Sequence, residues 1–158
     1  MSRVQLALRV ADLDASIAFY TKLFGTEPAK IRDGYANFAV ASPPLKLVLI
    51  QGEPGRDTVM DHLGVEVATT EEVTAATTRL AASGLVTLEE NDTSCCYAVQ
   101  DKVWVQGPGR EPWEVYVVKG EADTLAKHTD SACCLPADDA GVPLAVTGAA
   151  EPATGCCG

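Results

Sequence analysis

The sequence has no apolar run that approaches the length of a membrane span, and Met1–Gln5 lack the apolar character of a signal peptide. Positive charge is also scarce. Twelve Lys and Arg residues stand against 22 Asp and Glu residues, which gives a formal net charge of -10. This negative charge argues against a nucleic-acid backbone or an anionic membrane as a partner. We therefore expect a cytoplasmic protein that binds neither nucleic acid nor membrane.

The six cysteines lack the C-x-x-C and C-x-x-H spacings of a structural zinc site. They form three adjacent pairs instead: Cys95-Cys96, Cys133-Cys134 and Cys156-Cys157. Neighbouring Cα atoms are about 3.8 Å apart, which is less than the roughly 4.4–6.8 Å of an unstrained disulfide. In a reducing compartment, paired thiolates of this kind suit a soft metal or metalloid. The turn-forming residues 91–94 predict a loop that presents the first pair.

Local patterns predict the same order of elements twice. The first half is expected to hold a strand over 3–10, a helix over 13–24 and strands near 27–32, 35–41 and 45–51. The second half is expected to hold a strand over 60–67, a helix over 71–83 and strands near 85–90, 97–106 and 112–119.

The two halves also match residue by residue. Residues 60–67 repeat the pattern of 3–10 with an offset of 57, and the closing strands match with an offset of 68. This repeat predicts an α+β domain of residues 1–122, built from two β-α-β-β-β modules at about 3–53 and 60–121. Their curved mixed sheet would surround a metal-binding cavity. Residues 123–158 lack periodicity and are expected to form a flexible, cysteine-containing tail.

Three polar residues lie on strand faces opposite the large aliphatic side chains. Gln5 and His62 are equivalent through the repeat, and Glu114 lies on the last strand. An unpaired carboxylate is costly to bury, and a metal ion would remove that cost. Amide, imidazole and carboxylate together resemble a facial triad for Fe(II), although Ni(II), Co(II) or Mn(II) would also suit it.

The duplicated module with Gln5, His62 and Glu114 at its ligand positions resembles the vicinal oxygen chelate superfamily over residues 3–119. That superfamily includes glyoxalase I, extradiol dioxygenases and bleomycin-resistance proteins. Within it, three segments are similar to the ArsI carbon-arsenic lyases and the cadmium-induced CadI proteins. They are the run Asp-Thr-Ser-Cys-Cys-Tyr-Ala at 92–98, the run Lys-Val-Trp-Val at 102–105 with Gly-Pro at 107–108, and the run Glu-Pro-Trp-Glu-Val-Tyr at 111–116.

This resemblance implies an Fe(II)-dependent dioxygenase that acts in arsenic detoxification. It would cleave the C-As bond of a trivalent organoarsenical, such as methylarsenite or an aromatic arsenical, to give arsenite. Cys95 and Cys96 would anchor the arsenic, while Gln5, His62 and Glu114 would bind the iron and leave positions for dioxygen. The partner is then a small molecule, and a homodimer is compatible with the fold.

Two alternatives compete with this interpretation. A non-enzymatic thiol protein could sequester arsenite, cadmium or another soft metal, and it would need the cysteines but not the triad. A glyoxalase-type isomerase would need four protein ligands, two from each module. Lys46 stands at the fourth position, where its ammonium group would repel a metal, which disfavours the isomerase.

Further residues have less specific predictions. Arg9 and Glu66 are equivalent through the repeat and are expected to form a structural ion pair. Tyr97, Trp104 and Tyr116 would either wall the cavity around an aromatic arsenical or belong to the core. The cysteine pairs of the tail could pass a metalloid to Cys95-Cys96, or merely scavenge metal.

Overall fold

The computed structural model describes residues 2–125, which form an eight-stranded mixed sheet and two helices. The elements are β1 (Arg3–Val10), α1 (Leu13–Phe24), β2 (Lys30–Arg32), β3 (Tyr35–Val40), β4 (Leu45–Gln51), β5 (Val59–Glu66), α2 (Thr70–Ala82), β6 (Leu88–Cys95), β7 (Ala98–Gln106) and β8 (Pro112–Glu121). Within this part of the chain, neither helix has the length and apolar character needed to cross a membrane. The predicted tail beyond Leu125, with its four cysteines, lies outside the described residues.

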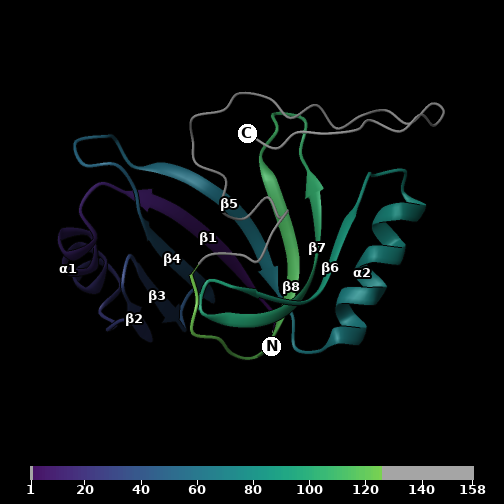
Figure 1. The fold of residues 1–158 in the computed structure, drawn as a ribbon, viewed down its shortest axis with the longest axis horizontal. Coiled ribbons are helices and arrows are strands. Elements are labelled where there is room, and N and C mark those ends of the chain that lie inside the picture. The colour runs from purple at the N-terminus through teal and green to yellow at the C-terminus, as the bar shows by residue number, and fades with distance from the viewer. Residues whose placement is uncertain (1, 126–158) are drawn as a thin grey trace, which may run out of the picture.

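The strand order is β2-β3-β4-β1-β5-β8-β7-β6, so each module contributes one half of the sheet (Figure 1). The halves meet where β1 pairs antiparallel with β5. Within each half, the first and last strands of the module pair in parallel, β1 with β4 and β5 with β8. The predicted repeat and its curved mixed sheet are therefore confirmed, and the first strands of both modules lie at the centre of the sheet.

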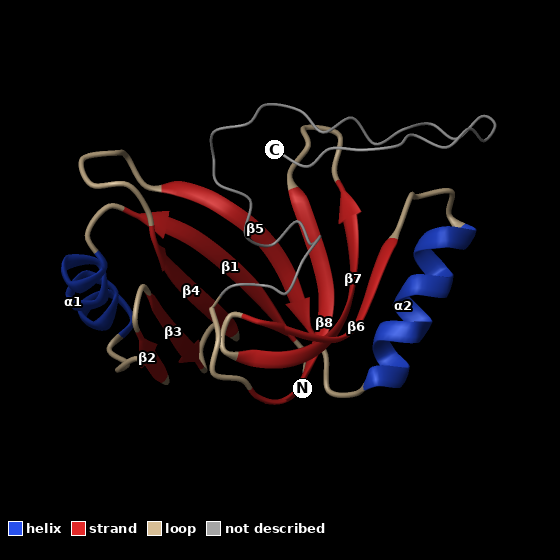
Figure 2. Cartoon of the chain, in the orientation of Figure 1, coloured by secondary structure: helices blue, strands red, loops and turns tan. Residues whose placement is uncertain are grey.

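The helices explain which face of the sheet is free for a site. Helix α1 begins after Asp12, whose carboxylate accepts from the Ala15 backbone N–H, and α2 begins with a capping box between Thr69 and Glu72. Each helix packs its apolar side on the aliphatic face of its own module, and the two helices flank the sheet at opposite ends (Figure 2). Because strand side chains alternate, the polar residues point to the opposite face.

The segment before the first cysteine pair differs from the prediction. Residues 91–94 were expected to form a loop, but β6 continues to Cys95 and pairs with β7 through Thr93, Ser94 and Cys95. Asp92 instead forms a local irregularity with a φ of 52°, and its backbone N–H donates to Asp101 Oδ1 at 2.8 Å. These turn-forming residues therefore make a bulge within a strand rather than a loop.

Candidate metal and thiol site

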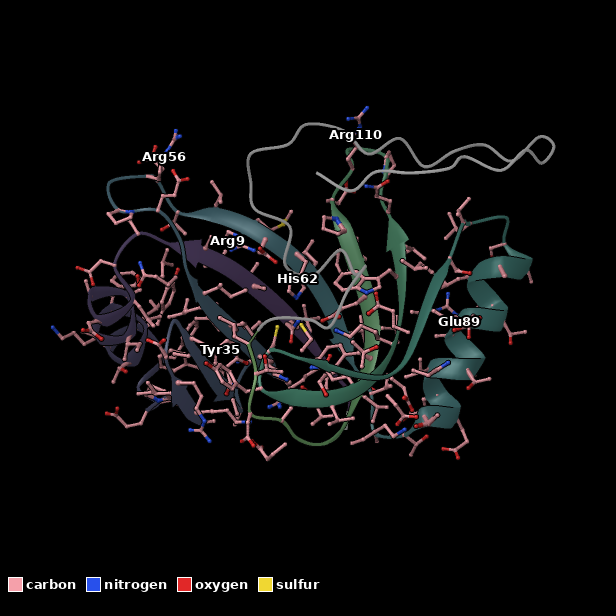
Figure 3. All side chains as sticks on the ribbon, in the orientation of Figure 1. Arg9, Tyr35, Arg56, His62, Glu89 and Arg110 are labelled. Atoms are coloured by element: carbon pink, nitrogen blue, oxygen red, sulfur yellow. The ribbon has the colours of Figure 1, made fainter. Side chains whose placement is uncertain are left out.

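The structure brings Gln5, His62 and Glu114 together on three neighbouring strands, β1, β5 and β8. In the sheet register Gln5 pairs with Gly64, and Gly64 pairs with Glu114. The three polar residues are only 4%, 2% and 2% exposed. Figure 3 shows His62 near the middle of the curved sheet. Side chains from both modules thus meet at one buried point of the sheet. Their role as metal ligands stays a prediction.

Gly64 leaves the space in which these side chains meet. A Cβ atom built at this position would lie 3.1 Å from Glu114 Cγ, 3.3 Å from Gln5 Cβ and 3.3 Å from Tyr116 Cε1. Such contacts are tighter than ordinary van der Waals separations. The missing side chain on the central strand therefore allows Gln5 and Glu114 to approach each other across β5.

The spacing of the three polar groups fits a single metal ion. Gln5 Nε2 lies 2.9 Å from His62 Nε2 and 2.8 Å from Glu114 Oε1, and His62 Nε2 lies 3.4 Å from Glu114 Oε1. Adjacent ligands of an octahedral ion with bonds of about 2.1 Å stand about 3 Å apart, so the amide oxygen of Gln5 would match this spacing if it took the place of Nε2. Among residues 2–125, no group of three or more His, Cys, Asp or Glu side chains is arranged to hold a metal. The trio of Gln5, His62 and Glu114 includes a glutamine, and we take it as the candidate metal site; it is called the polar trio below.

His62 is oriented by its neighbour in sequence. Its Nδ1 lies 2.6 Å from Asp61 Oδ1, and the other carboxylate oxygen of Asp61 lies 2.6 Å from Arg9 Nε. Because a carboxylate only accepts, Nδ1 donates its hydrogen to Asp61, and this contact turns Nε2 toward Gln5 and Glu114. The predicted Arg9–Glu66 ion pair is therefore wrong. Because β1 and β5 run antiparallel, Glu66 lies opposite Arg3, whereas Arg9 lies opposite Val59, near Asp61.

Gln5 is held from the other side by Tyr116. The tyrosine hydroxyl lies 2.6 Å from Gln5 Oε1 and 2.9 Å from Glu66 Oε2. Burial, together with the negative charges of Glu114 and Glu66, raises the pKa of Tyr116, so the hydroxyl keeps its proton.

Glu66 is in turn fixed by two cations. Arg3 Nη2 lies 3.0 Å from its Oε1, and Lys46 Nζ lies 3.0 Å from its Oε2. Burial alone would raise the pKa of Glu66, but Lys46, Tyr116 and Arg3 outweigh burial and hold the pKa below its ordinary value. Lys46, expected at the fourth ligand position, therefore pairs with a carboxylate beside the site.

A further lysine contacts the last member of the trio. Lys102, only 1% exposed, places its Nζ 2.8 Å from Glu114 Oε2. Its ammonium group also lies over the Trp104 and Tyr116 rings, at 5.2 and 5.9 Å from their centroids. This contact occupies one carboxylate oxygen of Glu114 and leaves Oε1 facing Gln5 and His62.

The cysteine pair lies at a hairpin rather than in a long loop. Cys95 ends β6, Ala98 begins β7, and the two residues between them, Cys96 and Tyr97, have positive φ angles of 56° and 59°. A two-residue connection with positive φ at both positions is the type I′ turn that suits the twist of paired strands.

Neighbouring segments hold this turn in place. The backbone N–H of Cys96 donates to Leu125 O at 3.2 Å, and that of Tyr97 donates to Thr124 O at 2.9 Å. Lys30 of the first module donates to Tyr97 O at 3.2 Å and also pairs with Glu121. The turn at Cys96-Tyr97, here called the thiol turn, is therefore held both by the first module and by the last described residues.

The two thiols have different surroundings. Their Sγ atoms lie 3.0 Å apart, which is longer than the roughly 2.05 Å of a disulfide bond, so they are in contact without being bonded to each other. Cys95 is fully buried against Trp104, whereas Cys96 is partly exposed. The turn thus brings two sulfur atoms together, but only Cys96 is partly accessible.

A cavity of about 290 Å³, here called the central cavity, joins the thiol turn to the polar trio. Its wall includes Gln5, His62, Glu114, Cys96, Lys102 and Tyr35. Of the predicted aromatic wall, Tyr97 packs on Tyr35 with ring centroids 5.5 Å apart, while Trp104 and Tyr116 are buried behind the cavity. Tyr97, Trp104 and Tyr116 therefore take the core role, and Tyr35 supplies the aromatic surface.

Several residues beside the site were not predicted. Lys102 follows the period-two alternation of β7 with Ala98 and Gln100, so its inward direction could have been read from the strand pattern. Gly64 is an isolated glycine in a strand, a pattern that often marks a close approach of neighbouring groups. For Asp61 no signal was present in the sequence, because its contact with Arg9 depends on the antiparallel pairing of β1 with β5.

Known proteins resemble this chain in sequence. A trivalent organoarsenical cleaving enzyme from Thermomonospora curvata is 70% identical over 146 residues, which cover 92% of this chain and 97% of that protein. The cadmium-induced protein CadI from Mycobacterium bovis is 54% identical over 143 residues, covering 85% of this chain and 93% of that protein.

Solved structures share the fold. A Mn(II)-bound glyoxalase from Novosphingobium aromaticivorans gives a TM-score of 0.55 at 19% identity, covering 78% of this chain and 43% of that one. An extradiol ring-cleaving dioxygenase from B. fuscum gives a TM-score of 0.54 at 21% identity, covering 77% and 34%. Residues 3–115 also match the model of one protein family. The chain therefore belongs to the glyoxalase/bleomycin resistance protein/dioxygenase superfamily.

Proposed function

We propose that this chain is an Fe(II)-dependent dioxygenase that cleaves the C-As bond of trivalent organoarsenicals and releases arsenite. The observation that carries the proposal is that Cys96 and the polar trio of Gln5, His62 and Glu114 line one central cavity. The 70% identity to a trivalent organoarsenical cleaving enzyme supports this choice of substrate. Methylarsenite and trivalent aromatic arsenicals are the substrates to examine.

The thiols supply selectivity for arsenic. An arsenic atom with one carbon substituent has two exchangeable positions, and Cys95 and Cys96 can occupy both while the carbon stays free. Cys96 lines the central cavity and makes the first bond, because Cys95 is fully buried. The second bond requires the turn at Cys96-Tyr97 to shift enough to expose Cys95.

The polar trio supplies the metal site. His62 presents Nε2, Glu114 presents Oε1, and Gln5 completes the set from β1. A bound Fe(II) would supply the redox chemistry with dioxygen. The protein residues contribute position, because burial excludes water and the thiol turn fixes the arsenical relative to the trio.

The direct test is a turnover experiment. The protein is reconstituted with Fe(II) without oxygen, methylarsenite and then oxygen are added, and arsenic species are separated and quantified. Arsenite above the iron-free control is expected. If arsenite does not exceed that control, the lyase proposal is refuted.

Two variants separate the proposed roles. Cys96→Ser should abolish turnover while Fe(II) still binds, because the thiol does not belong to the metal site. His62→Ala should lose the metal while the variant still binds methylarsenite through its cysteines. Turnover by Cys96→Ser, or an unchanged metal content in His62→Ala, would show that the roles are misassigned.

A second candidate is sequestration of arsenite, cadmium or another soft metal without catalysis. The 54% identity to cadmium-induced protein CadI favours it. In this case methylarsenite would bind in a fixed ratio and be recovered unchanged after denaturation, with or without Fe(II) and oxygen. The same arsenic analysis therefore distinguishes a reservoir from an enzyme.

A further inference from the structure

The Tyr116 hydroxyl faces two acceptors but has one hydrogen to donate. Gln5 Oε1 lies 2.6 Å from it and Glu66 Oε2 lies 2.9 Å from it. Tyr116 itself is fully buried, so water cannot supply a second donor. Glu66 is held in place by Arg3 and Lys46 and therefore remains an acceptor for the hydroxyl whichever way the O–H points.

The amide of Gln5 has two possible orientations in this pocket. In the structure, Nε2 faces His62 Nε2 and Glu114 Oε1, and Oε1 faces Tyr116. A cation among the trio requires the opposite orientation, because an amide binds metals through its oxygen and not through its NH2 group. A half-turn about Cγ–Cδ exchanges the two atoms with little change in shape.

We propose that Tyr116 is a positioning residue that selects the metal-binding orientation of Gln5. When Gln5 Oε1 turns toward the metal, Nε2 donates to the Tyr116 oxygen, and the Tyr116 O–H rotates to donate to Glu66. The Gln5–Tyr116 contact and the Tyr116–Glu66 contact then each have one donor and one acceptor. This inference rests on the metal site of the proposed function.

The expected consequence follows from removing the hydroxyl. In Tyr116→Phe the buried Nε2 loses its acceptor when Oε1 faces the metal, which penalises the metal-binding orientation. Changes to groups that orient metal ligands typically weaken metal binding by about 10- to 100-fold. A carboxylate at position 5 has no N–H group to satisfy, so the penalty should vanish there.

The first test measures Co(II) affinity by chelator competition. Tyr116→Phe should bind Co(II) about 10- to 100-fold more weakly than wild type. Tyr20→Phe, which removes a tyrosine hydroxyl from α1, should not change the affinity. In a Gln5→Glu background, Tyr116→Phe should alter Co(II) affinity by less than about threefold, a non-additivity that marks direct coupling.

A merely structural role would give another pattern. Thermal unfolding of the metal-stripped proteins would show a loss of stability in Tyr116→Phe, and the loss of Co(II) affinity would be the same with Gln5 or Glu at position 5. That result, or wild-type affinity in Tyr116→Phe, would overturn the inference.

The second test observes the amide directly. Nuclear Overhauser contacts of the Gln5 side-chain NH2, assigned by its loss in Gln5→Glu, are compared before and after Zn(II) is added. In the metal-stripped protein the NH2 should contact the His62 ring, and with Zn(II) bound it should contact the Tyr116 ring. A contact to His62 that persists with Zn(II) bound would refute the flip.

These readouts are independent of turnover. If Tyr116→Phe weakens Co(II) binding as expected but no arsenite forms, the inference stands and the proposed lyase activity fails. If arsenite forms but Tyr116→Phe binds Co(II) normally, the lyase proposal stands and the inference fails. If the wild-type protein binds no divalent ion, both fail.

Discussion

The sulfur atoms of Cys95 and Cys96 lie 3.0 Å apart, yet Cys95 is fully buried against Trp104 while Cys96 lines the central cavity. The two thiols are close enough to act on one atom, but one of them is shielded. Capture of an arsenical would therefore proceed in two steps, first at Cys96 and then at Cys95.

The first prediction concerns this unequal access. Iodoacetamide should alkylate Cys96 at least about tenfold faster than Cys95, because thiol reactivity follows exposure. Tandem mass spectrometry can assign the label to either residue of the pair. Equal rates for the two thiols would show that the turn opens freely in solution. Preincubation with methylarsenite should protect both residues.

The second prediction concerns the space beside Gly64. Gly64→Ala places a Cβ atom 3.1 Å from Glu114 Cγ and 3.3 Å from Gln5 Cβ, so the trio must spread. Co(II) affinity should fall by about tenfold or more. The control is Gly120→Ala, since an added Cβ there meets nothing within 4 Å. Equal affinities in the two variants would mean that β5 does not set the spacing of the trio.

The third prediction concerns the buried lysine. Lys102→Met leaves the buried Glu114 carboxylate without its cation and should lower the free energy of unfolding of the metal-stripped protein by about 3–5 kcal/mol. Co(II) should recover part of this loss, because it supplies positive charge to the same carboxylate. Chemical denaturation with and without Co(II) measures both effects. Lys22→Met, at an exposed position on α1, serves as the control, and a similar loss there would contradict the prediction.

The fourth prediction is a pH dependence caused by Glu66. Its pKa in the folded protein lies below the ordinary value of 4.5, so its stabilising contribution is present above pH 4.5. This contribution is lost as the pH falls through the folded-state pKa. Glu66→Gln should therefore be less stable than wild type at neutral pH and lose less stability on acidification below about pH 4.5. The exposed Glu89→Gln should follow the wild-type curve, and matching curves for all three proteins would refute the role of Glu66.

The sequence predicted the repeat, and it predicted that Gln5, His62 and Glu114 share one face of the sheet. Both predictions depend on the period-two alternation of side chains along a strand, which the folded sheet keeps. It did not predict the turn at Cys96-Tyr97, because neither cysteine nor tyrosine commonly takes a positive φ. The residue types at 91–94 are more typical of turns, so the turn was predicted there instead. It also paired Arg9 wrongly, because equivalence through the repeat says nothing of strand direction, and the antiparallel pairing of β1 with β5 puts Arg9 and Glu66 at opposite ends of the strand pair.

Gln5 and Glu114 are 109 residues apart in the chain but flank the same residue of β5. A ribosome must therefore release nearly the whole domain before any metal can bind to the trio. Nascent chains, truncated chains and chains with an undocked second module would all lack the site. Metal binding at the trio would consequently report that synthesis and folding of both modules are complete.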